Sequence, residues 1–300
     1  MNKKIDFTSC RRIPGKAYNG ANGKKIAVEY GGRQYMLKFP PSGKGKPTEL
    51  SYTNSCFSEY IACNVFNILG VTAQETVLGT FDVTGKTKVV CACRDFTADG
   101  RQLFDFCSIK NTILDSDSNG SGTELSDILD TIEKQQFIEP GRLLEYFWEM
   151  FVIDALLGNF DRHNGNWGFL YDPVSKTTHI SPVYDCGSCL LPQADERVME
   201  SVLENEDARN QRVFQFPTSA VKLNGRKINY YDFLTKAEYA DCNAAVKRIY
   251  SRLDLENIQR LIEETPYISG MQKMFYRCYI EARASLILTP AYKIILAESF

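Results

Sequence analysis

Alternating hydrophobic and polar positions predict two β-hairpins in the first hundred residues. The segments 24–30 and 33–39 alternate in this way, and a Gly-Gly pair of the kind that closes a tight hairpin joins them. The segments 74–82 and 86–96 predict a second pair of strands with a turn between them. The N-terminal third of the chain is therefore expected to be rich in β-structure.

Helical periodicity occurs between these pairs and dominates after residue 97. Apolar residues recur at helical spacing over 56–70, which predicts one helix between the hairpins. The segment 140–159 starts with a proline and is apolar nearly all round, so it predicts a buried central helix. Further helical patterns lie at 237–253, 255–264 and 269–288.

Two polar segments interrupt this pattern. Residues 115–127 are acidic and rich in Ser and Gly, which predicts a flexible loop leading into a helix. Residues 191–215 show few strand or helix signals. We predict an α+β fold with two lobes, a small β-rich lobe of residues 1–97 and a larger helical lobe of residues 98–300, joined near residues 94–98.

Composition and charge exclude several classes of protein. The chain has 300 residues, 44% of them hydrophobic and 24% charged, as in ordinary globular proteins. Its formal net charge of −2 gives no overall attraction to nucleic acids or anionic membranes. No apolar run reaches the roughly 20 residues that span a bilayer, and the N-terminus lacks the pattern of a signal peptide. We expect a cytoplasmic protein, with secretion by a signal-peptide-independent route left open.

The ten cysteines are scattered through apolar segments, which is typical of reduced, buried thiols. Cys186 and Cys189 have the spacing of a metal or redox pair, but a zinc site needs two further ligands. The nearest pair, Cys91 and Cys93, is too closely spaced, and the chain has two histidines. We therefore expect thiols without a metal.

Candidate chemistry begins in the polar stretch GNFDRHNGNWGF, which follows the predicted central helix. Asp161 and Asn166 lie five positions apart there, and Asp185 follows two short strand-like segments that would return the chain to the same place. The oxygens of Asn166 and Asp185 suit Mg²⁺, which leaves Asp161 to accept the proton of an attacking hydroxyl. Kinase catalytic loops use this order and spacing for phosphoryl transfer.

The β-rich region contains candidate residues for holding a nucleotide. Lys38 ends a predicted strand between two apolar residues, and Glu59 in the following helix is its candidate partner, as in kinases. Upstream, a glycine-rich turn offers backbone N–H groups and a cation to phosphates, although it matches neither the Walker pattern nor GxGxxG. The candidate residues of this turn are Gly20, Ala21, Asn22, Gly23 and Lys24.

Each feature also has a purely structural explanation. The polar stretch could cap a helix and form a turn, Asp185 could be a turn residue, and Lys38 could extend its ammonium to solvent. Glu59 could lie on a solvated helix face, and the glycines could form an ordinary turn. Their joint occurrence in kinase order favours the catalytic interpretation.

The motifs resemble those of HipA-like serine/threonine kinases over nearly the whole chain. The similarity lies in NGANGK, MLKFP, the helix from Asn54, VVCACRDF, FDRHNGNWGF and DCGSCL. It implies a two-lobed protein-kinase-like fold that binds ATP and Mg²⁺, with Asp161 as base and Asn166 and Asp185 holding the metal. It further implies that Lys38 contacts ATP. His163 is a further candidate at the nucleotide, with two alternatives left open: it could stabilise the transferred phosphate or only support the loop. The backbones of Arg94 and Phe96 would face adenine.

Two departures from the family concern partners and regulation. The chain starts almost at the phosphate loop, without the additional N-terminal domain of HipA toxins, so an antitoxin-like partner is left open and nucleic-acid binding is not expected. Residues 14–25 lack the regulatory serine of many family members, so we do not expect inactivation by autophosphorylation there.

Three functions compete at this stage. The first is an ATP- and Mg²⁺-dependent protein kinase that acts on Ser or Thr and also phosphorylates itself. The second is a phosphatidylinositol or small-molecule kinase, since DRHxxN is also a lipid-kinase pattern; no basic cluster in 186–215 supports it. The third is a nucleotide-binding pseudokinase scaffold, against which the intact candidate site argues.

Overall fold

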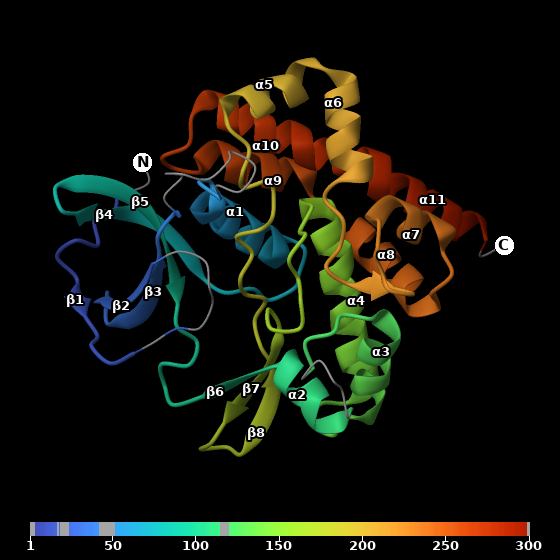
Figure 1. The fold of residues 1–300 in the computed structure, drawn as a ribbon, viewed down its shortest axis with the longest axis horizontal. Coiled ribbons are helices and arrows are strands. Elements are labelled where there is room, and N and C mark those ends of the chain that lie inside the picture. The colour runs from blue at the N-terminus through green and yellow to red at the C-terminus, as the bar shows by residue number, and fades with distance from the viewer. Residues whose placement is uncertain (1–3, 17, 19–23, 42–51, 115–119, 299–300) are drawn as a thin grey trace.

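The N-terminal part of the chain forms one antiparallel sheet (Figure 1). The structure is a computed structural model that describes residues 4–16, 18, 24–41, 52–114 and 120–298. The predicted glycine turn at 20–23 lies outside these residues. Both predicted hairpins are confirmed, and the strand order is β1-β2-β3-β5-β4. The strands are β1 (Arg11–Arg12), β2 (Lys25–Tyr30), β3 (Arg33–Lys38), β4 (Thr76–Val83) and β5 (Lys86–Arg94).

Helix α1 (Ser55–Ile68) connects β3 to β4 and joins the sheet to the helical part of the chain. One group of its buried residues, which includes Ile61 and Phe66, belongs to the same apolar core as the central helix α4 (Pro140–Leu157). Gly70 follows α1 with φ +81°, a conformation that favours glycine. Helix α1 precedes residue 97 but shares this core with α4. The predicted division into two lobes at residues 97 and 98 therefore stays a prediction.

A second, three-stranded sheet lies below the first in Figure 1. Its order is β6-β7-β8, with β6 (Gln102–Asp105), β7 (Gly168–Asp172) and β8 (Thr177–Ile180). The β7–β8 hairpin carries the chain from the polar stretch back to Asp185. Helices α2 (Phe106–Ile113) and α3 (Leu125–Lys134) pack beside this sheet and α4.

The central helix is buried as its sequence predicts. Pro140 occupies its first turn, and the Glu139 carboxylate accepts hydrogen bonds from two backbone N–H groups there. Gly158 ends it in the left-handed conformation. The later elements are the short strands β9 (Lys222–Leu223) and β10 (Arg226–Lys227) and the helices α7 (Tyr230–Lys236), α8 (Ala240–Ser251), α9 (Leu255–Glu264), α10 (Gly270–Arg283), η3 (Ala284–Leu288) and α11 (Thr289–Ala297). Helices α7, α8, α10 and η3 pack on the central helix, whereas α9 packs on α1 and α10, and α11 packs on α7, α8 and η3.

Residues 191–215 contain more regular structure than the sequence indicated. They form α5 (Glu196–Glu204), α6 (Glu206–Asn210) and the π-helical turn η2 (Gln211–Gln215). The Asp195 carboxylate caps α5 by accepting from the Val198 N–H, and Met199 and Val202 are buried where α5 packs on α10. Tertiary packing of two apolar residues therefore stabilises a helix whose own sequence is mostly polar.

Two expectations about the whole chain concern membranes and cysteines. No helix in the described ranges is both long and apolar enough to cross a membrane. All ten cysteines are free thiols, as expected.

Candidate active site

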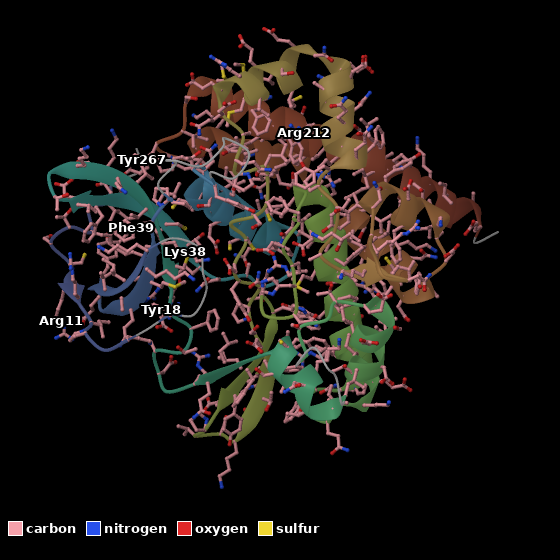
Figure 2. All side chains as sticks on the ribbon, viewed as in Figure 1. Arg11, Tyr18, Lys38, Phe39, Arg212 and Tyr267 are labelled. Carbon is pink, nitrogen blue, oxygen red and sulfur yellow. The ribbon has the colours of Figure 1, made fainter. Side chains whose placement is uncertain are left out.

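A cleft of about 760 Å³ lies between the five-stranded sheet and the helical part of the chain. Most of the candidate residues in the described ranges line it: Lys38, Glu59, Phe96, Asp161, His163, Asn166 and Asp185. They come from a strand, a helix and three connecting segments, so only the tertiary fold brings them together. Figure 2 shows Lys38 at the end of β3, on the side of the sheet nearest the helical part.

Lys38 is held between two carboxylates. Its Nζ lies 2.9 Å from Glu59 Oε2 and 2.9 Å from Asp185 Oδ1. Glu59 is 1% exposed, whereas the Asp185 side chain is 43% exposed and faces the cleft. The pairing of a strand lysine with a helix glutamate is the arrangement that an active protein kinase requires.

The surroundings shift the pKa values of this triad in different directions. Burial raises the pKa of Glu59 to about 7 despite its lysine partner. The Lys38 ammonium lowers the pKa of Asp185 to about 2. Although burial opposes it, the carboxylates of Asp185 and Glu59 raise the pKa of Lys38 well above its ordinary value. Lys38 and Asp185 are thus both charged at neutral pH.

Bonds within the loop of residues 159–166, the candidate catalytic loop, fix the backbone of Asp161 and the side chain of Asn166. The Asp161 N–H donates to Asn159 Oδ1 at 3.0 Å, and Asn166 Nδ2 donates to the Asp161 carbonyl at 2.8 Å. His163 Nδ1 accepts from the Gly165 N–H at 3.0 Å. Burial raises the pKa of the Asp161 carboxyl, which moves it toward the value of a general base.

Asn166 and Asp185 have the donor atoms that a magnesium nucleotide needs. The amide nitrogen of Asn166 bonds within the loop, so the side chain offers its oxygen as the metal-binding atom. Asp185 is ionised, cleft-facing and bonded to Lys38 through one oxygen. Among the described residues no cluster of three or more His, Cys, Asp or Glu could hold a metal. A two-ligand site fits Mg²⁺, since this ion keeps several waters and binds substrate phosphates.

Comparison with known proteins establishes the family. The model of the HipA-like C-terminal domain matches residues 17–265. The chain belongs to the HipA-like C-terminal domain family. It is 50% identical over 292 residues to the serine/threonine-protein kinase CtkA of Helicobacter pylori (strain J99 / ATCC 700824), covering 96% of this chain and 87% of that protein.

Solved structures agree with this assignment. The crystal structure of the H. pylori proinflammatory kinase CtkA superposes with a TM-score of 0.91 at 47% identity and covers 98% of this chain and 99% of its own. HipA of Shewanella oneidensis MR-1, solved with HipB and operator DNA, shares the fold at a TM-score of 0.57 and 14% identity, over 98% and 75% of the two chains. The predicted family, α+β kinase-like fold and serine/threonine kinase function are confirmed.

Arg162, which the sequence analysis did not single out, organises the whole loop. Its buried guanidinium bonds Asp154 of α4 through Nε at 2.9 Å. Its Nη1 donates to the carbonyls of Asn166 at 2.9 Å and Tyr184 at 2.6 Å. It therefore joins the catalytic loop to the segment that carries Asp185. An aspartate in the apolar second half of the central helix was the available signal, since buried carboxylates need partners.

Asn54, just before α1, fastens the segment after Asp185. Its backbone N–H donates to the Pro192 carbonyl at 3.0 Å, and its Nδ2 donates to the Ala194 carbonyl at 2.7 Å. Gln272 of α10 donates to its Oδ1 at 3.1 Å. The helix that carries Glu59 is thus tied to both ends of segment 185–194: through Lys38 at Asp185, and through Asn54 at Pro192 and Ala194.

Lys25 is a second cleft cation that the sequence analysis missed. It lies directly opposite Lys38 in the β2–β3 register and also lines the cleft. Burial and the nearby Lys38 charge lower its pKa. Neighbouring cations on paired strands repel each other, so their placement favours an anion between them. Lys24, the candidate beside it, packs its ammonium over the Phe39 ring and does not line the cleft.

Arg94 is not among the residues that line the cleft, so its role beside adenine stays a prediction. Its N–H donates to the Glu75 carbonyl, its carbonyl accepts from Gln74 Nε2, and its side chain pairs with Glu75 in a separate shallow hollow. Its backbone groups are therefore already bonded within the protein. Phe96 does line the cleft, where its ring lies 5.9 Å from that of Tyr184.

Asp95, between them, ties this connecting segment to the residues before the glycine turn. Its carboxylate accepts from Tyr18 at 2.8 Å and pairs with Lys16. These bonds hold the edge of the cleft where we expect adenine.

Proposed function

We propose that this chain transfers the γ-phosphate of ATP, in the presence of Mg²⁺, to a serine or threonine hydroxyl of a protein. One observation carries the proposal: Lys38 is fixed between Glu59 and Asp185 in the same cleft as Asp161 and Asn166. This arrangement supplies positioning and charge, which are the main needs of phosphoryl transfer.

The nucleotide would lie with adenine toward Phe96 and Tyr184 and its phosphates toward Lys38. Lys25, on the neighbouring strand, would bind the same phosphates. The sequence of residues 20–24 resembles the family's phosphate loop, which supports phosphate binding at this end of the cleft. Lys25 and Lys38 together would place two positive charges beside the phosphates.

The metal would be held by Asn166 and Asp185. When bound, Mg²⁺ supplies charge neutralisation at the phosphate oxygens. The low pKa of Asp185 keeps this ligand ionised at any pH at which the protein works.

Asp161 would act as the base. The attacking hydroxyl oxygen forms a bond to the γ-phosphorus, its proton passes to the Asp161 carboxylate, and the bond between the γ-phosphorus and the bridging oxygen breaks to release ADP. The raised pKa of Asp161 supports this role, since a more basic carboxylate accepts a proton more readily. His163, which lines the same cleft, would lie near the transferred phosphate.

A radiolabelled ATP assay with Mg²⁺ tests the assignment. We expect the wild-type protein to label itself and Ser/Thr substrates, and Asp161→Ala and Asp185→Ala to abolish the labelling. Transfer that survives in both variants would contradict these roles. Labelling of inositol lipids instead of protein would favour the alternative acceptor, and nucleotide binding without any transfer would indicate a scaffold.

We also propose that the protein works in a reducing compartment such as the cytoplasm. Its free, largely buried thiols support this location. Thiol titration of protein isolated under conditions that prevent thiol exchange would reveal ten reduced cysteines if the proposal is correct.

A further inference from the structure

A row of three aromatic rings begins beside Asp161. The rings are those of Tyr52, which precedes α1, Phe160 of the catalytic loop, and Phe216, which follows η2. The ring centroids of Tyr52 and Phe160 are 5.9 Å apart, and those of Phe160 and Phe216 are 5.4 Å apart. These spacings are those of packed aromatic side chains. We call these three residues the aromatic row.

The aromatic row is supported from below by the end of the central helix. A Cβ atom on Gly158 would lie only 3.1 Å from Pro217 Cγ, so the segment after Phe216 packs directly on the glycine backbone. The Tyr230 hydroxyl donates to the Asn159 carbonyl at 2.6 Å and holds the start of the catalytic loop. Phe160 and Phe216 are therefore presented by backbone that is fixed on both sides.

The aromatic row extends from the cleft to the protein surface. Tyr52 lines the cleft with Asp161, whose carboxylate adds to the effect of burial in raising the pKa of the Tyr52 hydroxyl. At the outer end Phe216 is 36% exposed. Single exposed apolar residues are common on protein surfaces, but three adjoining rings next to a catalytic base are a candidate binding surface.

The geometry of phosphate transfer determines which part of a substrate reaches the aromatic row. The nucleotide site lies along Lys38 and Phe96, and the acceptor hydroxyl must come within hydrogen-bond reach of Asp161. Tyr52 lines the cleft with Asp161 and its ring contacts that of Phe160, so the aromatic row is positioned to meet the part of the acceptor that flanks its hydroxyl. On an extended peptide, side chains two residues apart lie on the same side, roughly 7 Å from each other. A side chain two residues from the acceptor therefore lies on the same side of the peptide as the hydroxyl that faces Asp161.

We propose that the aromatic row binds a large apolar side chain of the protein substrate, two residues from the phosphorylated Ser or Thr. The inference rests on the proposed kinase function and adds a rule for substrate choice. Burial of a large apolar side chain against the rings would strengthen binding of the matching peptide about tenfold or more. Peptides with a charged residue at that position would bind correspondingly less well.

A positional-scanning library of Ser/Thr peptides, assayed with radiolabelled ATP and Mg²⁺, tests this proposal. We expect the wild type to select Phe, Tyr, Trp, Leu or Met two positions from the acceptor. Phe216→Ala should flatten this selection and raise KM for the best peptide about tenfold, with KM for ATP unchanged. Phe216→Leu should keep the preference for apolar residues, which separates loss of the surface from loss of folding.

Phe137→Ala is the matched control, because Phe137 is 51% exposed and its ring packs on Phe169, away from the aromatic row. This variant should keep the wild-type selection. An unchanged selection in Phe216→Ala would overturn the proposal. So would a wild type that labels itself but accepts no library peptide, shows no apolar preference, or prefers lipid vesicles. A wild type without any phosphate transfer would instead refute the proposed function.

Discussion

The two ends of the catalytic cleft are built on different physical principles. At the nucleotide end, Lys38, Glu59 and Asp185 come from three separate segments and meet through ion pairs of 2.9 Å. At the acceptor end, Asp161 is oriented by bonds within its own loop, and its outer neighbours are aromatic rings. In the proposed assignment, charge therefore specifies the nucleotide end, whereas shape and apolar surface specify the acceptor end.

This difference matches what stays constant and what varies between reactions: the nucleotide is always the same, whereas the acceptor protein changes. Every turnover brings the same triphosphate charge, so a fixed ionic site serves all of them. Acceptor proteins share a hydroxyl group but differ in the residues around it, so discrimination has to come from contacts beside Asp161. The following changes separate the two ends.

Arg162→Ala should have the largest effect, because Arg162 supports both ends of the cleft. The change leaves Asp154 buried without its cation and removes the bonds to Asn166 and Tyr184. We expect the free energy of unfolding to fall by about 3–5 kcal/mol, measured by urea denaturation. Arg260→Ala, at an exposed pair with Glu256, is the control and should change it by less than about 1 kcal/mol. Equal losses in both variants would contradict the role of Arg162.

Lys38→Met should damage the nucleotide end alone. It leaves the Glu59 and Asp185 carboxylates without the cation between them, so phosphates lose a partner and Asp185 loses its orientation. We expect kcat/KM for ATP to fall about 100-fold or more, measured by steady-state kinetics. The ranking of library peptides by residual activity should stay the same. A changed ranking would show that the two ends are not separate.

Asn54→Ala tests whether the tether between α1 and the segment after Asp185 matters for activity. Loss of its side chain leaves the Ala194 carbonyl and Gln272 without their partner. We expect stability to fall by about 1–3 kcal/mol and kcat to fall with it. Asn67→Ala, within α1, is the control, since the Asn67 side chain accepts from the Ala73 N–H and has no described bond to the segment after Asp185. It should lower stability without a comparable loss of kcat; equal kcat losses would rule out a specific tether.

The pH dependence should show the smallest effect and again concern the nucleotide end. With the pKa of Glu59 near 7, acidification protonates this carboxyl and weakens its pairing with Lys38. We expect kcat/KM to fall about tenfold from pH 8 to pH 6. Glu59→Gln should remove this acidic limb, whereas His163→Gln should retain it. Persistence of the limb in Glu59→Gln would assign it to another group, such as Asp161.

The carboxyl groups of Glu59 and Asp185 make the free energy of unfolding depend on pH in opposite directions. The folded protein holds the Glu59 proton more tightly than the unfolded chain, so this group makes the free energy of unfolding fall as pH rises from about 4.5 to about 7. The contribution of Asp185 is fully present above its ordinary pKa of 3.8 and is lost as pH falls toward about 2. Thermal unfolding of Glu59→Gln and Asp185→Asn over this range would separate the two contributions.

The sequence by itself determined the local elements and the types of residue in the site. Alternating strands, the Gly-Gly turn and the apolar central helix depend on near neighbours, so periodicity was sufficient to predict them. The order of Lys38, Glu59, Asp161, Asn166 and Asp185 carried enough of the kinase pattern to predict the function. Helix α5 escaped prediction because it is stabilised by packing on α10, a contact between distant parts of the chain.

Only the tertiary structure decided which side chains meet. The bonds of Arg162 to Asp154, Asn166 and Tyr184 and those of Asn54 to Pro192 and Ala194 span connections that no periodicity encodes. The engagement of the Arg94 backbone, the position of Lys25 opposite Lys38, and the aromatic row likewise arise where separate segments are packed together. Local sequence specifies local conformation, whereas a buried charge or an assembled surface acquires its partners only when the core closes.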